Sequence, residues 1–570
     1  MFLYRGINLF VVVAHRASLT HAAIQVDLVS HPARFMADPY NEKMNDSPNP
    51  SPIQRSRRKL PIGIQTFAKI REDNAYYVDK TGFAVDLAER GTYYFLSRPR
   101  RFGKSLFLDT LKELFEGNLP LFKGLAAENR WDWSKKHAVI RISFGGGVLG
   151  SVADLGQSLH QQLSALERQY QLPAEFQDAR SRLKDLILRL AKRTGLRVVI
   201  LVDEYDKPIL DRLDKPDIAI QIREVLKDLY SVIKDSDAYI EFAFLTGVSK
   251  FSKVSLFSGL NNLEDITLDA AYSDICGYTD ADVDRVFAPE LVGLDRDEIR
   301  RWYNGYNWLG TAVYNPFDLL KLFRFREFRS FWFESATPGF LVKLLEQRQQ
   351  FTPDLSCIVA PETLLSTFDV GNIPVEALLF QTGYLTIDSV RHLAGLMQIK
   401  LRYPNLEVRT SLNAVLLQSL TAHATQYGIH ATRLYDLLTA HDFEGLKNLF
   451  HAFYASIASD WYRKNELSHY EGYYVSIFYS YFAALGIDIR LEDPTNVGRI
   501  DMTVLFNAQV FLFEFKVVEL SPKGRALQQI KDMNYAQKYQ ARGEPIHLIG
   551  VEFSKADRNI VGFEVETLST

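Results

Sequence analysis

The sequence contains few cysteines and no long apolar segment, and both absences narrow its class. Cys276 and Cys357 are the two cysteines among 570 residues, too few for a disulfide scaffold or a zinc cluster. The apolar stretch near the N-terminus, Gly6–Ala14, is too short to span a bilayer. We therefore expect a cytoplasmic protein with no membrane partner.

An excess of positive charge is also missing. The formal net charge is −3 and the isoelectric point is near 6.5, so any binding of nucleic acid must rely on a local surface. Hydrophobic residues make up 47% of the chain and aromatic residues 13%, which is typical of a folded protein. Because 570 residues exceed the size of one core, three or four domains are expected.

The N-terminal segment does not read as part of a fold. Residues 1–59 end in a polar, proline-rich and basic stretch, NDSPNPSPIQRSRRK. We interpret them as a disordered extension or as one wrongly assigned to the protein, with Met44 as the natural start. A weak signal peptide is the alternative interpretation, because small residues follow the apolar stretch.

Periodicity divides the remaining chain into three regions. Residues 60–265 alternate strands and helices, which predicts a mainly parallel sheet covered on both faces. Residues 266–450 read as mostly helical, and residues 451–570 as helix, hairpin, helix and strand. The expected strands are Thr92–Leu96, Ala138–Phe144, Arg197–Val202 and Tyr239–Thr246, and the expected helices are 104–115, 152–170, 178–193 and 217–234.

The segment RPRRFGKS at residues 98–105 follows an apolar strand and precedes an amphipathic helix. This is the setting of a phosphate-binding loop, in which backbone N–H groups and the helix N-terminus hold an anion. Gly103 permits close approach of the backbone, Lys104 would reach the β- and γ-phosphates, and Ser105 would bind Mg²⁺. The usual pattern has glycine where Arg98 stands, so a merely basic helix start is the alternative interpretation.

A second motif about a hundred residues later supports the nucleotide site. In RVVILVDEYD, five apolar residues end in two acids, as expected for a buried strand whose carboxylates reach the ligand edge of the sheet. Asp203 would bind Mg²⁺ and Glu204 would polarise the attacking water. The alternative is a strand that ends in an ordinary polar turn.

Other polar groups near this site have open roles. The strand EFAFLTGVSKF ends in Thr246 and Ser249, either of which could contact the γ-phosphate. Arg98, Arg100 and Arg101 could contact phosphates, and Arg100 or Arg101 could also reach the nucleotide of a neighbouring subunit. Solvated loop arginines are the alternative.

The sequence GRIDMTVLFNAQVFLFEFKVVE near the C-terminus predicts a hairpin that brings acids together. A turn centred near Ala508 would place Asp501 across from Phe515 and beside Glu514. Glu514 and Lys516 share one face of the strand because side chains alternate. Asp501 and Glu514 would bind Mg²⁺ or Mn²⁺, with the Phe515 carbonyl as a further ligand, and Lys516 would orient or deprotonate the attacking water.

Neighbouring segments extend this second candidate site. Glu471, on an aromatic-rich helix, would complete the acidic set, while Gln537 and Tyr539 would flank the substrate. The alternative is a surface ion pair between Glu514 and Lys516 on an edge strand. WYNGYNW, Trp332 and Tyr384 are interpreted as packing residues, with base stacking as the alternative.

Taken together, these motifs resemble those of an AAA-ATPase-like domain followed by a PD-(D/E)XK nuclease-superfamily domain. The resemblance covers almost everything after residue 59. It rests on the following segments: LPIGIQTFAKIRE (60–72), YYVDKT (76–81), RPRRFGKSLF (98–107), LVDEYDKPI (201–209), LTGVSKFSKVSLFSGLNNLEDIT (245–267), WYNGYNW (302–308), VYNPFDLL (313–320), FWFESATPGFL (331–341), FQTGYLTI (380–387), YPNLEVR (403–409), YEGYYVS (470–476) and the D…EFK pair.

The resemblance implies a fold and a chemistry. It implies an α/β multidomain protein with an N-terminal P-loop NTPase sheet (60–265), a mostly helical middle (266–450) and a C-terminal restriction-endonuclease-like domain (451–570). It implies that arginine at residue 98 is usual in the family. It also implies that the ATP and Mg²⁺ site consists of Lys104, Ser105, Asp203 and Glu204, and that the nuclease site consists of Asp501, Glu514 and Lys516.

We therefore expect an ATP-regulated, metal-dependent nuclease that acts on DNA, with a homo-oligomer as a possible state. One alternative is a nucleotide-dependent switch whose nuclease fold binds nucleic acid or protein without cleaving. Another is an active ATPase that carries an inactive nuclease domain.

Overall fold

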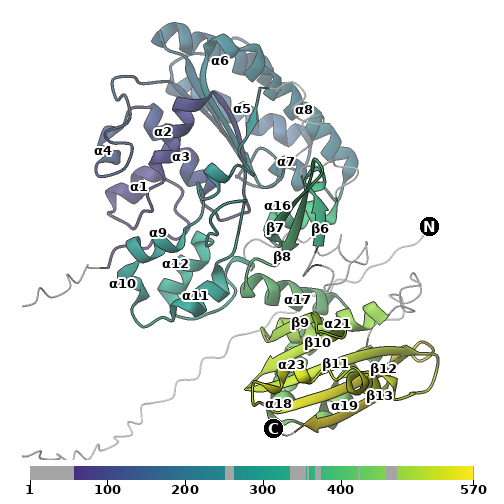
Figure 1. Ribbon diagram of the computed structural model, residues 1–570. Helices are drawn as coiled ribbons and strands as arrows, with labels where there is room; N and C mark the ends of the chain where they lie inside the picture. The colour runs from purple at the N-terminus through teal and green to yellow at the C-terminus, as the bar shows by residue number, and fades with distance from the viewer. Residues whose placement is uncertain are drawn as a thin grey trace, which may run out of the picture. The chain divides into compact units, whose positions relative to one another are not determined.

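The computed structural model describes residues 57–250, 262–333, 355, 358–365, 374–420, 424–456 and 471–568. The expected N-terminal extension therefore lies almost entirely outside the described residues. A five-stranded sheet with the order β2-β3-β4-β1-β5 organises the first part of the chain (Figure 1). Each neighbouring pair in this sheet is parallel. The strands are β1 (Tyr93–Ser97), β2 (Val139–Ser143), β3 (Val198–Asp203), β4 (Ile240–Gly247) and β5 (Glu264–Asp265).

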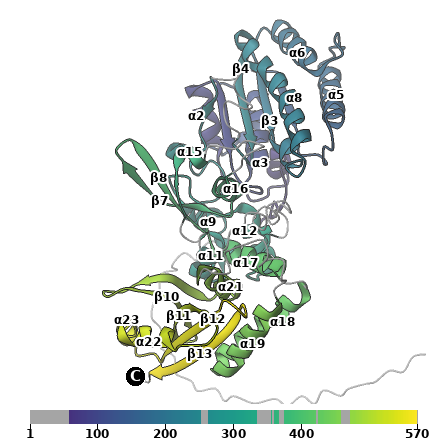
Figure 2. The same cartoon turned by 90° about the vertical axis from the view of Figure 1, so that its right-hand side faces the viewer.

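Helices cover both faces of this sheet, so its central strands are buried (Figure 2). Helices α2 and α3 lie on one face, and α5, α6 and α8 lie on the other. The bounds are α1 (Phe67–Glu72), α2 (Thr81–Arg90), α3 (Lys104–Phe115), α4 (Leu119–Phe122), α5 (Val152–Gln169), α6 (Ala179–Thr194), α7 (Lys207–Leu210), α8 (Pro216–Asp235) and the 3₁₀ turns Asp237–Tyr239 and Ala270–Tyr272. The four strands and four helices predicted from periodicity are confirmed to within one residue at each end.

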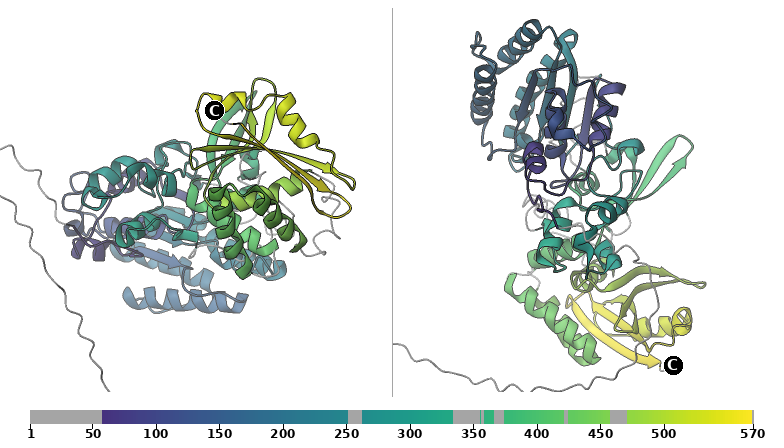
Figure 3. Two further views of the ribbon diagram at one scale, coloured as in Figure 1. Left: turned by 90° about the horizontal axis from the view of Figure 1, so that it is seen from below. Right: turned by 90° about the vertical axis from the view of Figure 1, so that its left-hand side faces the viewer.

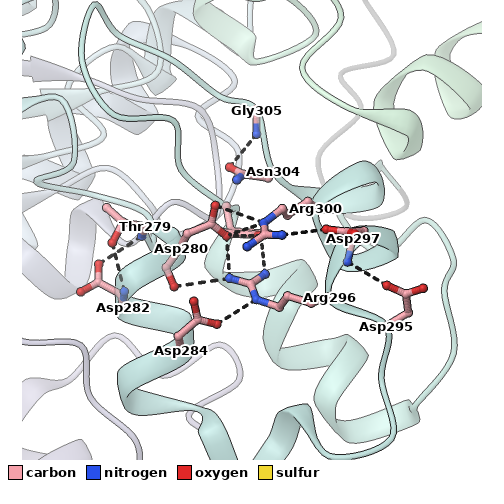
Figure 4. Close-up of polar contacts among 11 residues, drawn as sticks. Thr279, Asp280, Asp282, Asp284, Asp295, Arg296, Asp297, Arg300, Asn304 and Gly305 are labelled. Atoms are coloured by element: carbon pink, nitrogen blue, oxygen red, sulfur yellow. Dashed lines mark hydrogen bonds and ion pairs between the residues drawn. The ribbon is translucent and has the colours of Figure 1, made fainter.

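A short helical group follows the N-terminal sheet. It consists of α9 (Asp280–Val286), α10 (Ala288–Leu291), α11 (Arg296–Tyr303) and α12 (Pro316–Phe325). Asp280 at the start of α9 accepts hydrogen bonds from Arg296 and Arg300 of α11, at 2.5 and 3.3 Å (Figure 4). The hydroxyl of Tyr314 donates to the same carboxylate at 2.7 Å. These contacts fasten α9 and α11 to the segment that leads into α12.

The middle region is mostly helical, as predicted, but it also contains a sheet that periodicity did not predict. The antiparallel order β6-β8-β7 is formed by β6 (Ile358–Pro361), β7 (Thr386–Leu393) and β8 (Leu396–Arg402). The hairpin of β7 and β8 extends from its neighbours (Figure 2, Figure 3). Strand β7 has the sequence TIDSVRHL, which is polar and largely exposed, so it lacks the apolar run of a buried strand. The accompanying helices are α15 (Glu362–Leu365), α16 (Val375–Thr382), α17 (Leu406–Leu420), α18 (Ala424–Ala440) and α19 (Phe443–Ser456).

The C-terminal part is a second five-stranded sheet, in the order β13-β12-β11-β10-β9. Strands β11 and β12 are parallel and the other pairs are antiparallel. Helix α19 lies on one face, and α22 and α23 lie on the other (Figure 2). The bounds are α21 (Glu471–Ala484), β9 (Asp488–Pro494), β10 (Arg499–Phe506), β11 (Gln509–Val518), α22 (Arg525–Asp532), α23 (Gln537–Gln540), β12 (Ile546–Ser554) and β13 (Asn559–Leu568).

The core of this sheet includes residues that precede the boundary expected at 450/451. Leu417 of α17 and Leu434 of α18 belong to the same buried cluster as Phe478 of α21 and Phe513 of β11. The expected boundary falls inside α19. Helices α18 and α19 therefore pack with the last sheet, whereas α17 joins two cores, because its Val408, Leu412 and Leu416 belong to the N-terminal cluster.

Candidate functional site

The loop between β1 and α3 has the backbone of an anion-binding turn. Gly103 precedes the first residue of α3 with φ +96°, and Arg101 has φ +70°. Glycine adopts this left-handed conformation without steric cost, which brings the backbone close to a bound group. The N-terminus of the 12-residue helix α3 carries free N–H groups and a partial positive charge at this point.

Lys104, the first residue of α3, is buried and folds back over the loop. Its Nζ donates hydrogen bonds to the carbonyl oxygens of Arg98 and Pro99, both at 2.9 Å. Burial lowers the pKa of Lys104, and the nearby carboxylates of Glu204 and Asp203 oppose this effect. A phosphate group would offer this ammonium a full negative charge in place of two carbonyl dipoles.

A cavity of about 360 Å³ opens over the loop and over the end of β3. Its polar wall contains Arg101, Gly103, Lys104, Ser105 and Glu204. The remaining wall contains residues for which the sequence analysis proposed no role. They include Pro61, Gly63, Ile64, Gln65, Ile70, Tyr76, Tyr77, Val78, Lys80, Lys207, Tyr278, Pro316, Phe317 and Leu320. Several of them lie in the segments 60–72 and 76–81, which carry part of the family resemblance. That resemblance was the signal in the sequence that could have identified them as cavity residues.

Of the two acids at the end of β3, Glu204 lines this cavity and Asp203 does not. Burial raises the pKa of Glu204, whose φ of +52° marks a sharp turn directly after the strand. Asp203 is 3% exposed, and its Oδ1 has no hydrogen-bond partner among the described residues. Its Oδ2 lies 3.8 Å from Nη2 of Arg141. A buried carboxylate oxygen without a donor fits a site that receives a cation.

Thr246 and Ser249, the two candidates for contact with the γ-phosphate, bind protein groups. The hydroxyl of Thr246 donates to the Leu96 carbonyl at 2.9 Å. Asp206 accepts hydrogen bonds from N and Oγ of Ser249, at 2.6 and 2.5 Å, and from N of Val248 at 3.0 Å. Asp206 thus anchors the end of β4 beside β3, a role that the sequence analysis missed.

Arg98 occupies a position different from the one expected of a phosphate ligand. Its buried guanidinium donates to the carbonyls of Ser97 and Thr267 at 2.9 Å and of Tyr272 at 3.1 Å. It lies 4.2 Å from the ring centre of Trp308, and burial lowers its pKa to about 10. In this position the side chain supports the loop from behind and does not line the cavity described above.

The remaining loop residues also contact the middle region. The carbonyl of Arg100 accepts a hydrogen bond from Nε1 of Trp332 at 3.0 Å. The guanidinium of Arg101 lies 4.8 Å from the ring centre of Phe317. Trp332 and Tyr384 are buried, which confirms their interpretation as packing residues.

The second candidate site lies on β10 and β11, where a two-residue turn sets the register. Asn507 and Ala508 have φ +48° and +55°, and the ladder pairs Met502 with Phe513. Asp501 and Glu514 are therefore the next residues on the two strands. The predicted pairing of Asp501 with Phe515 was wrong by one residue, because the turn is centred between residues 507 and 508 rather than on 508.

The predicted convergence of charged groups is present. Oδ2 of Asp501 accepts a hydrogen bond from N of Phe515 at 2.8 Å. Lys516 donates to Oε1 of Glu514 at 3.0 Å and to the Phe515 carbonyl at 2.8 Å. Glu514 is fully buried, and burial raises the pKa of Asp501.

Helix α22 adds a contact that the sequence analysis missed. Nε2 of Gln529 donates to Oε1 of Glu514. The helix comes this close because Gly550 of β12 lies against it: a Cβ at residue 550 would overlap the backbone of Leu527. Glu552 of β12 accepts hydrogen bonds from the backbone N of Arg525, at 2.7 Å, and of Lys523, and so fixes the start of the helix.

The other residues expected at this site are placed differently. The hydroxyl of Tyr539 donates to Asp493 at 2.5 Å, and Gln537 is the first residue of α23. Glu471 begins α21, but its side chain lies outside the described part of the chain. Within the described ranges, no group of three or more histidine, cysteine, aspartate or glutamate side chains is arranged to hold a metal ion.

Comparisons with known proteins agree with this two-site architecture. Residues 61–257 match the family described as predicted AAA-ATPase, and residues 469–563 match the PD-(D/E)XK nuclease superfamily. A protein of Azotobacter chroococcum mcd 1, described as the uncharacterized protein in the vnfD 5′ region, is 63% identical over 514 residues, covering 90% of this chain and 100% of its own length.

The chain belongs to the AAA-ATPase-like proteins with a C-terminal PD-(D/E)XK nuclease-superfamily domain. The parallel first sheet and the mixed last sheet of this family member agree with the two matches. No solved structure matches the chain. Among the described helices of this AAA-ATPase-like protein, none has the length and apolar character needed to cross a membrane.

Proposed function

We propose that the protein binds and hydrolyses Mg·ATP at the loop 98–105 and that the nucleotide controls metal-dependent hydrolysis of DNA by the C-terminal domain. The cavity over the α3 N-terminus carries this proposal, because it brings Lys104, Ser105 and Glu204 together beside buried Asp203. A cytoplasmic location and a homo-oligomeric state are parts of the same proposal.

Each polar group of the first site has a role that follows from its position. The N–H groups at the start of α3 would hold the phosphates, and Lys104 would leave the carbonyls of the loop to contact them. Ser105 and Asp203 would hold Mg²⁺, which would neutralise phosphate charge. Glu204 would accept a proton from the attacking water, because burial raises its pKa and so makes its ionised carboxylate a stronger base.

In the second site, Asp501 and Glu514 would hold Mg²⁺ or Mn²⁺ together with the Phe515 carbonyl. The metal would stabilise negative charge on the scissile phosphate. Lys516, now in contact with Glu514, would turn towards that phosphate or the attacking water. Gln529 would keep Glu514 in position throughout, since it approaches from the helix side.

The test uses the full-length protein with plasmid and single-stranded DNA, with Mg²⁺ or Mn²⁺, and with or without ATP. Asp501→Asn should reduce metal-dependent cleavage by about a thousandfold, since the carboxylate charge is lost at constant shape. Asp493→Asn is the matched control, because Asp493 is a buried acid on the adjacent strand β9 that binds Thr503, Lys538 and Tyr539. Equal cleavage by the wild type and Asp501→Asn would contradict the nuclease assignment.

The nucleotide site is tested separately by equilibrium binding of a fluorescent ATP analogue. Lys104→Ala should weaken binding about 10- to 100-fold, the usual effect of losing a hydrogen bond from a charged group. Thr246→Val is the control, because its hydroxyl is bound to the Leu96 carbonyl. Unchanged affinity in Lys104→Ala would contradict the phosphate-binding role of the loop.

One observation favours the second candidate function, a nucleotide-dependent switch that binds nucleic acid without cleaving it. In the structure Lys516 and Gln529 both donate to Oε1 of Glu514, a carboxylate that a catalytic metal would need. Binding of Mn²⁺ to the full-length protein distinguishes the two functions. The enzyme predicts binding that is lost in Asp501→Asn, and the switch predicts DNA binding that is independent of metal.

A further inference from the structure

Residues 98–101 contact the middle region at every position. Besides the bonds of Arg98 described above, Pro99 packs against Gly383 at the end of α16, where a Cβ would lie 2.8 Å from the proline ring. Arg100 accepts the hydrogen bond from Trp332, and Arg101 lies over Phe317. The phosphate loop is therefore held in place by contacts with the middle region as well as by its own sheet.

Trp332 connects this loop to α17. Its indole Nε1 donates to the Arg100 carbonyl, while its backbone N donates to Oε1 of Glu407 at 2.8 Å. The backbone N of Phe331 donates to the same oxygen at 2.7 Å. Glu407, the second residue of α17, thus holds the segment that carries the indole.

Glu407 also lies near helix α12. Glu407 and Asp318 of α12 are both fully buried, and each carboxyl group affects the pKa of the other. Burial raises the pKa of both groups, because it disfavours the charged form. Glu407 therefore ties Trp332 to α17 at a buried position beside α12.

Helix α17 leads to the second site through α21. Leu417 of α17 and Phe478 of α21 belong to one buried cluster. The ring of Phe478 lies 5.2 Å from the ring of Phe515. Phe515 stands between Glu514 and Lys516 on β11, and its backbone N holds Asp501.

The element with two states is the loop itself. Lys104 now binds the carbonyls of Arg98 and Pro99, and a phosphate would draw the ammonium away from them. The loop would then change its contacts next to the Arg100 carbonyl, which Trp332 holds. A ligand shifts an equilibrium only through such a difference in contacts between the two states.

We infer that Trp332 and Glu407 are positioning residues that transmit nucleotide binding at loop 98–105 through α17 and α21 to the carboxylates of β10 and β11. This inference rests on the proposed function, since it requires a nucleotide at the loop. It adds the route by which that nucleotide controls the second site, and that route needs no direct contact between the two sites.

Amide hydrogen exchange of the full-length protein, with and without the non-hydrolysable analogue AMP-PNP and Mg²⁺, tests the route without depending on cleavage. Exchange in the wild type should slow at the phosphate loop and, by about fivefold or more, in α17 and α21. In Trp332→Phe and in Glu407→Ala the loop should still respond, while α17 and α21 should not.

Two matched variants separate this role from mere packing. Glu407→Gln keeps an acceptor for the two backbone N–H groups and should retain the response. Trp302→Phe removes an indole that donates to Glu298 on α11, away from the loop, and should also retain it.

The outcomes are distinct. A response of α17 and α21 that persists in Trp332→Phe and Glu407→Ala would overturn the route, as would a wild-type response confined to the loop. No response at the loop, together with no binding of the analogue, would instead overturn the proposed nucleotide function and the inference with it.

Discussion

In the N-terminal sheet Lys104 donates to two carbonyl groups, whereas in the C-terminal sheet Lys516 contacts the carboxylate of Glu514. Asp203 keeps an oxygen without a donor, whereas Asp501 accepts from a backbone N–H. In the described part of the first site the lysine has no carboxylate within hydrogen-bonding distance, whereas in the second site Asp501, Glu514 and Lys516 already have partners within the protein. Ligand binding should therefore change the first site more, while loss of a buried cation should destabilise the protein at either site.

The largest effect on stability should come from restoring glycine to the phosphate loop. Arg98→Gly removes three hydrogen bonds from a buried cation and its contact with Trp308, and should cost about 3–5 kcal/mol of unfolding free energy. Arg101→Gly is the control, since Arg101 is exposed and already has a positive φ. Urea unfolding followed by circular dichroism measures the stability of both variants. If Arg98→Gly were as stable as the wild type, the contacts of the Arg98 side chain would not be needed to hold the loop.

Removal of Lys516 should have the next largest effect. Lys516→Ala takes the cation away from fully buried Glu514, and should cost about 2–3 kcal/mol after allowance for the partly exposed ammonium. Lys555→Ala removes an exposed partner of Glu519 and should cost under about 0.5 kcal/mol. If thermal unfolding shows the same small change for both lysine variants, the ion pair between Lys516 and buried Glu514 does not stabilise the second site.

The contact between Pro99 and Gly383 offers a test with a closely matched control. Gly383 and Gly395 both have φ +93°, but a Cβ would meet Pro99 only at Gly383, while residue 395 has open space. Both alanine variants should lose about 1 kcal/mol from backbone strain, and Gly383→Ala about 1–2 kcal/mol more from overlap. The affinity for the ATP analogue should also fall in Gly383→Ala alone. An equal affinity in the two variants would contradict the inference that the contact between Pro99 and Gly383 supports the loop.

The last expected effect is a dependence of stability on pH. Burial raises the pKa of the Asp318–Glu407 pair above the ordinary value of a carboxyl group. The folded state therefore binds more protons than the unfolded state, so stability falls as pH rises from about 4.3 towards neutrality, by at most about 1.4 kcal/mol per pH unit. Glu407→Gln should flatten this slope. Melting temperatures from pH 5 to 7.5 measure it, and parallel curves for the two proteins would exclude the pair as its source.

Apolar runs and local motifs were enough to predict the strands and helices of the first sheet and the positions of several candidate site residues. The run Val198–Val202 placed β3 and its two acids, and the Gly103-Lys104-Ser105 motif placed the start of α3. The hairpin register was missed by one residue, because turns centred on one residue or between two give equally plausible alternation. The β7–β8 hairpin was missed because β7 is too polar to resemble a strand, although Met397, Ile399 and Leu401 of β8 alternate with polar residues.

Long-range partners account for the other differences. The side chain of Arg98 binds groups at residues 267, 272 and 308, a set that no local spacing reveals. Gln529 contacts Glu514 only because Gly550, in another strand, lets α22 approach. Such contacts depend on packing between distant segments, and a single sequence does not show which segments meet.

The core shared by the last sheet and α17–α19 limits how this protein can be recombined. A cassette cut at the expected boundary of residue 451 would leave Leu417 and Leu434 behind and open the interior of the transferred part. A junction ahead of α17 would in turn take Val408, Leu412 and Leu416 away from the N-terminal core. Chimaeras should therefore express as soluble proteins most often when α17 and both cores that it joins come from closely matched relatives.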